Sequence, residues 1–425
     1  MSGSFRFVHA ADLHLDTPFQ GIARPAPGVA QALQEASLQA WDNLVALTLE
    51  REAVFLLIVG DIYDGADRGV RAQLRFLAGL KRLDEAGVRT FVVHGNHDPL
   101  DGWSAIREWP AGVKVFGPDE VEIETVTIGE QRVRVHGISF ATRDTQENLA
   151  RRFRASADGA LNIGLLHTNV GGNAEYASYA PCSLSDLDAA RMDYWALGHI
   201  HKQQYLREGG PWVAYSGDVQ GRSPKPSETG AKGVLVAEVS GSTIGPVTFE
   251  PVDVVRFVTC AVDIEGVADV PSLSSRIIDL VDEMRGANAE RSLLVRVVLQ
   301  GRGAIASDLR HGTALDDALG DLRASYDGLD PFVWIESLKD QSRGALDLDA
   351  LRARDDFNAE LLRLYDRLAT DPDAGEAFVK TAASKLDSAG QVEKALRGLD
   401  AQAPEEVLIE ALHVALDGLE RKADA

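Results

Sequence analysis

The chain has 425 residues, of which 45% are hydrophobic and 25% are charged, and its formal net charge is -22 at pH 7. This length exceeds what one hydrophobic core usually supports, so we expect two or three domains, and the composition excludes a fibrous or intrinsically disordered protein. The acidic balance argues against the broad basic face that most nucleic-acid-binding proteins use, although bound cations could still supply positive charge at a local phosphate site.

The sequence contains no sign of export or of membrane insertion. The first residues show no basic stretch followed by an apolar run, and no apolar segment approaches the ~20 residues that cross a bilayer. The two cysteines, Cys182 and Cys260, match no metal-binding or redox spacing. We therefore expect a protein of the reducing cytoplasm with no membrane contact.

From Phe5 to about Asp253, short apolar strands alternate with helical stretches, which predicts an α/β fold. Long amphipathic helices are predicted at 29–52 and 70–86, and closely spaced β segments after Lys114 indicate a mixed sheet or a two-layer sandwich. The strands are predicted at 5–10, 54–59, 88–94, 133–136, 161–167, 194–197 and 234–239. The segment 216–233 is rich in glycine, proline and serine and is predicted to be a surface loop.

Two further regions follow the first. Strands at 257–264, 293–300 and 332–336, with helices at 271–285 and 304–324 between them, predict a small α/β accessory domain over 254–342. Alternatively, this region only extends the first core. The remainder, 343–425, is acidic and shows helical patterns alone, at 351–368, 376–386 and 404–419. These helices either present apolar residues to a partner helix or pack on their own chain.

Five short segments of the first region hold nearly all the potential hard metal ligands that follow predicted strands. Loops that leave the carboxyl ends of strands converge in open α/β sheets, so these segments are expected to meet. Imidazole nitrogens together with carboxylate and amide oxygens suit manganese, iron or zinc. A single Asp-x-His is more often a surface pair, but five segments in order favour joint ligation. They are Asp12-Leu13-His14, Gly60-Asp61-Ile62-Tyr63-Asp64, Gly95-Asn96-His97-Asp98, Leu166-His167-Thr168 and Gly198-His199-Ile200-His201.

In this order the segments resemble the motifs of the calcineurin-like metallophosphoesterases, and the match covers roughly residues 5–240. The resemblance implies a four-layer sandwich of mixed β-sheets flanked by helices, with residues 1–253 as the catalytic domain. It also implies two divalent metal ions, expected to be Mn2+, with Fe2+, Zn2+ or Mg2+ as alternatives. The implied ligands are Asp12, His14, Asp61 and His201 for the first ion, and Asp61, Asn96, His167 and His199 for the second, with Asp61 as the bridge.

The same resemblance implies that His97 protonates the leaving oxygen and that Asp98 orients its ring, a pairing that would fix the tautomer of the imidazole. For contact with the substrate we predict Arg143, Arg222 and Lys225, which lie in loops near the motifs. For each of these three residues taken singly, solvated surface charge is the slightly better explanation.

Residues 7–16, 166–172 and 193–201, and the order of the domains, resemble the bacterial DNA-repair exonucleases of the SbcD and YhaO-like type. That resemblance implies cleavage of DNA, a cap domain at 254–342 that helps to hold it, and a tail at 343–425 that docks on an SbcC-like SMC-type ATPase. It also implies a homodimer through 29–52. Some nucleases of this group have histidine where this chain has Asp64, so one phosphate-positioning imidazole is missing.

Two other functions remain open from the sequence. A phosphodiesterase or phosphatase for small substrates is mildly favoured by the acidic composition. A mainly structural protein that recruits an ATPase is disfavoured, because every predicted ligand and His97 are present.

Overall fold

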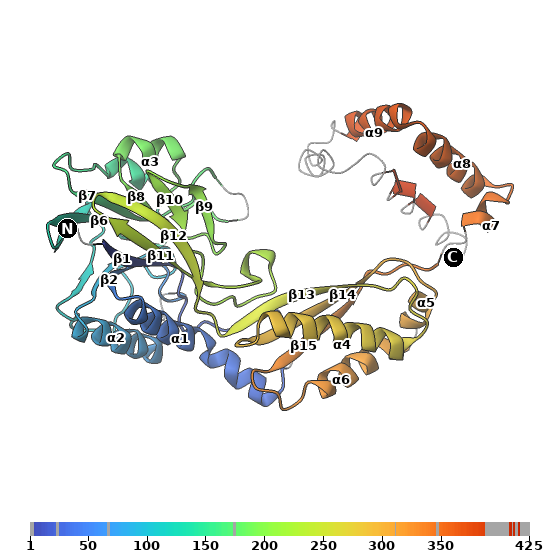
Figure 1. Ribbon diagram of the computed structural model, residues 1–425, viewed down its shortest axis with the longest axis horizontal. Coiled ribbons are helices and arrows are strands. Elements are labelled where there is room, and N and C mark those ends of the chain that lie inside the picture. The colour runs from blue at the N-terminus through green and yellow to red at the C-terminus, as the bar shows by residue number, and fades with distance from the viewer. Residues whose placement is uncertain are drawn as a thin grey trace. The chain divides into compact units, whose positions relative to one another are not determined.

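The computed structural model describes residues 4–22, 25–65, 69–172, 176–310, 312–345 and 348–386, with 408–409, 411–412 and 415–416. The chain divides into two compact units, Met1–Arg343 and Gly344–Ala425, and most of their helices and strands are labelled in Figure 1.

Two six-stranded mixed sheets form the first part of the larger unit (Figure 1). The first sheet has the order β12 (Thr243–Pro251), β11 (Gly233–Ser240), β1 (Ser4–Ala10), β2 (Ala53–Val59), β3 (Arg89–Val93) and β4 (Val113–Val115). The second has the order β5 (Glu122–Ile128), β6 (Gln131–Gly137), β7 (Leu161–His167), β8 (Tyr194–Gly198), β10 (Trp212–Tyr215) and β9 (Gln204–Arg207). Strands β1 to β4 run parallel to one another, as do β6, β7, β8 and β10.

Aromatic side chains fill the space between these sheets. The ring of Phe7 in β1 stacks on Phe55 of β2 at a centroid distance of 5.1 Å and meets Tyr194 of β8 edge-on at 5.1 Å. All three side chains are fully buried. The alternate residues of the same strands, such as Val8 and Leu56, face the helices and are buried as well. Burial on both faces explains why these strands read as continuous apolar runs.

Helices cover the outer faces of both sheets. Helices α1 (Pro27–Glu50) and α2 (Val70–Glu85) pack on the first sheet. Helix α3 (Leu184–Ala190) and the 3-10 helix η1 (Leu149–Arg152) pack on the second. The order helix, sheet, sheet, helix confirms the predicted fold class. The apolar stripe of α1 is buried within its own chain, against the first sheet and against strand residues near 255–257, so it provides no support for a dimer.

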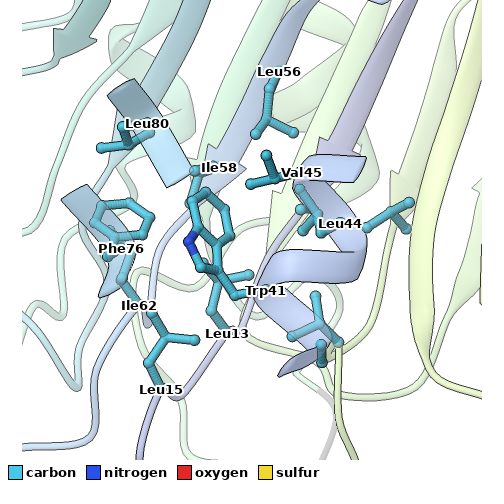
Figure 2. Close-up of a cluster of buried hydrophobic side chains, with 14 of the residues drawn as sticks. Leu13, Leu15, Trp41, Leu44, Val45, Leu56, Ile58, Ile62, Phe76 and Leu80 are labelled. Carbon is cyan, nitrogen blue, oxygen red and sulfur yellow. The ribbon is translucent and has the colours of Figure 1, made fainter. Parts of the chain in front are cut away.

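Trp41 of α1 is the centre of the helix-facing core. Its ring is fully buried, lies 4.9 Å from the ring of Phe76 in α2, and donates its Nε1 hydrogen to the carbonyl of Arg75 at 3.2 Å. Figure 2 shows Leu13 and Leu15, from the loop after β1, packing in the same cluster. The core therefore anchors the loop that carries Asp12 and His14.

The rest of the larger unit contains a parallel sheet of β13 (Val255–Asp263), β14 (Ser292–Gln300) and β15 (Val333–Asp340). Helix α4 (Val270–Ala287) connects β13 to β14, and α5 (Ile305–Leu309) with α6 (Ala314–Ser325) connects β14 to β15. The single helix predicted at 304–324 is wrong, because Gly312 takes a φ of +63° between two shorter helices.

This region has its own buried core, and a smaller apolar cluster joins it to the first region. Its core includes Leu273 and Ile277 of α4 against Val295 of β14. At the amino ends of its strands, Phe257 packs against Leu33 of α1.

The smaller unit contains α7 (Leu348–Arg352), α8 (Phe357–Thr370) and α9 (Pro372–Leu386). The helix predicted at 351–368 is interrupted, because the Asp356 carboxylate caps α8 by accepting a hydrogen bond from the Ala359 N–H at 3.1 Å. Most of the helix predicted at 404–419 lies outside the described residues. Among the described helices, none has the length and apolar character that crossing a bilayer requires.

The contact between α1 and α2 predicts an unusual response to a helical glycine substitution. Alanine in place of a helical glycine usually stabilises a protein by about 1 kcal/mol. At Gly79, however, a Cβ atom would lie 2.4 Å from Trp41 Nε1. We expect Gly79→Ala to lower the free energy of unfolding by about 1–3 kcal/mol, measured by urea denaturation. Gly320→Ala in α6 is the control, since its Cβ would meet nothing within 4 Å; equal stabilisation by both substitutions would contradict the packing described here.

Candidate functional site

The seven side chains predicted as metal ligands lie where five strands of the two sheets end. Strands β1, β2 and β3 of the first sheet are parallel neighbours, and so are β7 and β8 of the second. The carboxyl ends of neighbouring parallel strands meet at one edge of a sheet, so their loops converge. These residues are Asp12 and His14 after β1, Asp61 after β2, Asn96 after β3, His167 at the end of β7, and His199 and His201 after β8.

One group of ligand atoms comes from Asp12, His14 and His201, and these atoms lie within 4.8 Å of one another. The Nε2 atoms of His14 and His201 are 3.2 Å apart. The Asp12 carboxylate is buried and accepts a hydrogen bond from the backbone N–H of His199 at 3.0 Å. The loops after β1 and β8 therefore hold each other in place.

A second group comes from Asp61, His167 and His199, whose ligand atoms also lie within 4.8 Å of one another. His167 Nε2 is 3.3 Å from Asp61 Oδ2 and 3.0 Å from Asn96 Oδ1. The other oxygen of Asp61 accepts a hydrogen bond from the backbone N–H of His97 at 2.9 Å. Asp61 thus leaves one oxygen directed at the histidine cluster.

Hydrogen bonds to the far ring nitrogens set the tautomers of three of these histidines. Nδ1 of His167 donates to the Val59 carbonyl at 3.0 Å, and Nε2 of His199 donates to the Ala177 carbonyl at 2.9 Å. Nδ1 of His201 donates to the Glu228 carboxylate at 3.3 Å. In each neutral ring the nitrogen that faces the cluster is then a lone-pair donor, the arrangement that metal-binding histidines have.

This donor set fits divalent cations. Burial lowers the pKa of His167, but the charge of Asp61 and the hydrogen bond between them outweigh burial and raise the pKa to about 9. Positive charge is therefore favoured between His167 Nε2 and the oxygens of Asp61 and Asn96, which is where a divalent cation would bind. His14 Nδ1 is buried without a hydrogen-bond partner among the described residues. Burial raises the pKa of Asp12 to about 6, so in that pocket its charge requires compensation.

The backbone of the ligand loops is held in an uncommon conformation. Asp12, His14, Asp61 and His199 have φ values of 51°, 43°, 52° and 101°, in the left-handed region that residues with a Cβ atom seldom adopt. Such strain persists only where the surroundings enforce it, and it gathers at functional sites.

Glycines make room for the histidine at the centre of the site. A Cβ atom at Gly95 would lie 2.4 Å from Asp61 Oδ1 and 2.8 Å from His167 Nε2. At Gly198 it would lie 1.9 Å from the Val59 carbonyl oxygen. The glycines of the sequence motifs are therefore required by close packing around the ligands.

His97 lies beside the first group and is oriented by Asp64. Its Nδ1 is 2.5 Å from Asp64 Oδ1. Burial lowers the pKa of His97, but the hydrogen bond that His97 donates to Asp64 and the charge of Asp61 outweigh burial and raise the pKa above its ordinary value. The charged ring is thus favoured.

The structure gives Asp98 a different part from the predicted one. The Asp98 carboxylate is fully buried and accepts hydrogen bonds from the backbone N–H groups of Asp61, Ile62 and Gly95 at 3.1, 3.0 and 2.9 Å. It is also 3.0 Å from Nδ1 of His94. Asp98 therefore braces the loops after β2 and β3, and the carboxylate that orients the His97 ring is Asp64.

A hollow of about 170 Å³ opens beside His97. Arg222 lines it with 8% of its surface exposed, and its Nη1 atom lies 3.6 Å from Asp64 Oδ2. Lys225 also lines the hollow and is exposed. Arg143 is exposed and is not among the residues that line the hollow, although its charge is close enough to oppose protonation of His97.

Sequence reasoning missed Glu228 and the burial of the segment that carries it. Residues 216–223 are buried, so the prediction of a surface loop at 216–233 is wrong for that part. Hydrogen bonding to His201 and the charge of Arg222 outweigh burial and hold the pKa of Glu228 at about 2. Glycine and proline in this segment allow tight packing rather than exposure, and no local pattern distinguishes the two.

Comparisons with known proteins agree with this site. Residues 5–203 match the calcineurin-like phosphoesterase family, and residues 257–343 match the middle domain of the metallophosphoesterase YhaO. The chain is 34% identical to YhaO of Bacillus subtilis, described as an uncharacterised metallophosphoesterase, over 85% of this chain and 87% of that protein.

Weaker similarity extends to two DNA-processing proteins. The DNA double-strand break repair protein Mre11 of Haloferax volcanii is 24% identical over 92% of this chain and 88% of its own length. The SbcD component of the nuclease SbcCD of Bacillus subtilis is 26% identical over 50% of this chain and 61% of its own length. The predicted resemblance is confirmed, and the chain belongs to the calcineurin-like metallophosphoesterase family, in which YhaO is its homologue.

Proposed function

We propose that this metallophosphoesterase is a cytoplasmic DNA nuclease of DNA repair that hydrolyses phosphodiester bonds with two divalent ions, expected to be Mn2+. The main support is the presence of two groups of ligand atoms, linked by the hydrogen bond from the His199 N–H to Asp12, beside His97 and a hollow lined by Arg222. The relatives Mre11 and SbcD support DNA as the substrate.

We propose the ligand sets on the basis of the two groups. We assign one ion to the site of Asp12, His14 and His201, and the other to the site of His167, His199 and Asn96, with Asp61 shared between them. When bound, two such cations polarise the phosphoryl oxygens and make hydroxide available as a nucleophile near neutral pH.

The chain's own residues supply positioning and proton transfer. Asp64 occupies Nδ1 of His97, which leaves Nε2 to protonate the leaving oxygen. Arg222 offers a guanidinium in a nearly buried position, where a charge-assisted hydrogen bond to a phosphate oxygen is strong. Lys225 and Arg143 are exposed and would contact phosphates farther along a strand.

The acidic composition bears on the choice of substrate. With a net charge of -22 the protein repels DNA at long range, so binding depends on local positive charge at the site. A hydrolase for small phosphodiesters or phosphomonoesters is the second candidate, and the hollow of about 170 Å³ beside His97 favours it.

A partner is proposed for the smaller unit. Helix α8 carries Leu361 and Leu364, which line an apolar pocket with Phe378 of α9, and Phe378 is 46% exposed. Such a surface suits an apolar helix. We infer that residues 343–425 dock on the coiled coil of an SbcC-like SMC-type ATPase. Recruitment of that ATPase would then be a second role of the protein, in addition to catalysis.

Loss of a ligand is expected to remove metal without unfolding the protein. His167→Ala should release at least one of the two divalent ions, because His167 Nε2 lies beside both Asp61 and Asn96. Metal content after dialysis against Mn2+ is the measurement. His136→Gln is the control, since His136 is buried but bonded to Asn162 away from the site; equal metal content in both variants would refute the ligand assignment.

General-acid catalysis predicts a dependence on the leaving group. A deoxyribose alkoxide requires a proton, whereas a nitrophenolate does not, so His97→Ala should slow Mn2+-dependent cleavage of linear duplex DNA by about 10²–10⁴-fold. Cleavage of a chromogenic nitrophenyl diester should fall much less. Asp64→Asn should follow the same pattern, with metal content unchanged.

The wild-type protein provides the decisive comparison in this assay. Cleavage of the chromogenic diester alone, with intact DNA, would favour the small-substrate hydrolase. Equal losses on both substrates in His97→Ala would exclude His97 as the acid.

Removal of the tail tests the partner. Truncation before Leu346 should abolish capture of a coiled-coil ATPase from the native cell extract and leave hydrolysis of the chromogenic diester intact. Capture of that ATPase by the truncated protein would show that the tail is not the docking site.

A further inference from the structure

Glu228 lies outside the five ligand-bearing segments, yet it contacts two different parts of the site. It ends the 3-10 helix η2 (Pro226–Glu228) between β10 and β11, and it is 7% exposed. Its Oε1 accepts a hydrogen bond from Nδ1 of His201 at 3.3 Å, and its Oε2 accepts one from the backbone N–H of Arg222 at 2.8 Å. Both acceptor oxygens of one carboxylate are therefore in use.

The segment that carries Glu228 is fastened to the backbone of His201. Lys232 Nζ pairs with Asp218 Oδ1 at 2.8 Å and donates to the His201 carbonyl at 2.9 Å. At Gly217 a Cβ atom would lie 2.8 Å from that same carbonyl oxygen. The segment cannot shift without displacing His201.

The position of Arg222 is set through its main chain. Its N–H is held by Glu228, and its carbonyl accepts a hydrogen bond from the N–H of Gln20 at 2.8 Å. These contacts fix where the side chain leaves the backbone, and the guanidinium then reaches the hollow that His97 and His201 also line. A buried arginine aimed into a site suits a phosphate oxygen.

We propose that Glu228 is a positioning residue that couples the metal ligand His201 to the phosphate-binding arginine Arg222. The inference rests on the proposed function, because it needs His201 to bind a cation and Arg222 to bind a phosphate. The new element is that the single carboxylate of Glu228 orients the imidazole of His201, which would bind the cation, and also holds the loop of Arg222, which would bind the substrate.

Substitution of Glu228 by glutamine tests whether Glu228 acts through its two hydrogen bonds or only through its negative charge. A glutamine side chain has one acceptor oxygen and one donor amide, whereas His201 and Arg222 both present N–H donors. In Glu228→Gln the amide oxygen can therefore accept a hydrogen bond from only one of these two N–H groups, and the amide NH2 is left facing the other N–H group. Glu228→Asp keeps both acceptors but withdraws them by one methylene.

Two titrations of the full-length protein read the two arms separately. Titration of Mn2+ into metal-free protein measures the contact with His201. In Glu228→Gln, the affinity of one of the two Mn2+ sites should fall by about 10–100-fold. Inorganic phosphate titrated into protein saturated with Mn2+ measures the Arg222 arm, and the same variant should bind it about 10-fold more weakly. Arg222→Met should lose phosphate affinity alone.

Glu336→Gln is the matched control, because Glu336 is also 7% exposed and bonded to an arginine, Arg296, but lies in β15. It should leave both titrations unchanged. A folded Glu228→Gln protein that keeps wild-type affinity in either titration would overturn the coupling. If that variant does not fold, Glu228→Asp is expected to show both losses in smaller measure, and wild-type binding by it would overturn the inference.

Failure of the proposed function gives a different result. A wild-type protein that binds no Mn2+ would contradict the metal centre itself. Wild-type binding of Mn2+ with unchanged binding in the Glu228 variants would contradict the coupling alone.

Discussion

Asp12 and Asp61 are buried carboxylates that face several imidazole rings, and much of the surrounding structure serves to make that burial tolerable. Each accepts a backbone N–H from the loop of another strand, from His199 and His97 respectively. Burying ionised groups is unfavourable unless they are paired, hydrogen-bonded or bound to a metal. The glycines at 95 and 198 and the left-handed backbone at the ligand positions follow from the same need for close approach.

The hydrophobic core and the site depend on each other through alternating side chains. In the loop after β1, Leu13 and Leu15 enter the cluster around Trp41, while Asp12 and His14, which alternate with them, lie beside the candidate ligand His201. The same loop thus gains packing energy on one side and meets the strain of a left-handed backbone on the other. Backbone hydrogen bonds from the N–H groups of Asp12, His14 and Leu15 to the carbonyls of residues 60–62 add to this packing and hold the strained loop in place.

The segment between β10 and β11 links the metal centre to the rest of the larger unit. Near its start, Gln220 accepts hydrogen bonds from the N–H groups of Val254 and Val255, where β13 begins, at 2.9 and 3.2 Å. Farther along, Gly230 donates to the carbonyl of Phe257 at 2.9 Å. The parallel sheet of the middle region is therefore hydrogen-bonded to the same segment that carries Arg222 and Glu228.

The sequence by itself determined the fold class and the set of candidate ligands, because both depend on local order. Apolar strands followed by polar residues place those residues at strand ends, and parallel pairing then brings strand ends together. The glycines beside the ligands are visible in the same motifs. The long helices α1, α2 and α4 were also predictable from periodicity, whereas the short α3 was not predicted. Gly312 and Asp356 interrupt otherwise helical patterns through special backbone geometry and capping ability respectively.

Only the tertiary structure decided which carboxylate is hydrogen-bonded to which histidine ring. Asp98 follows His97 directly, yet three backbone N–H groups draw its carboxylate inward, whereas Asp64 reaches His97 from 33 residues away. Glu228 reaches His201 from 27 residues away through a segment whose composition suggests exposure. A hydrogen bond depends on the distance and direction between two atoms, and for residues on different loops these are set by how the loops pack.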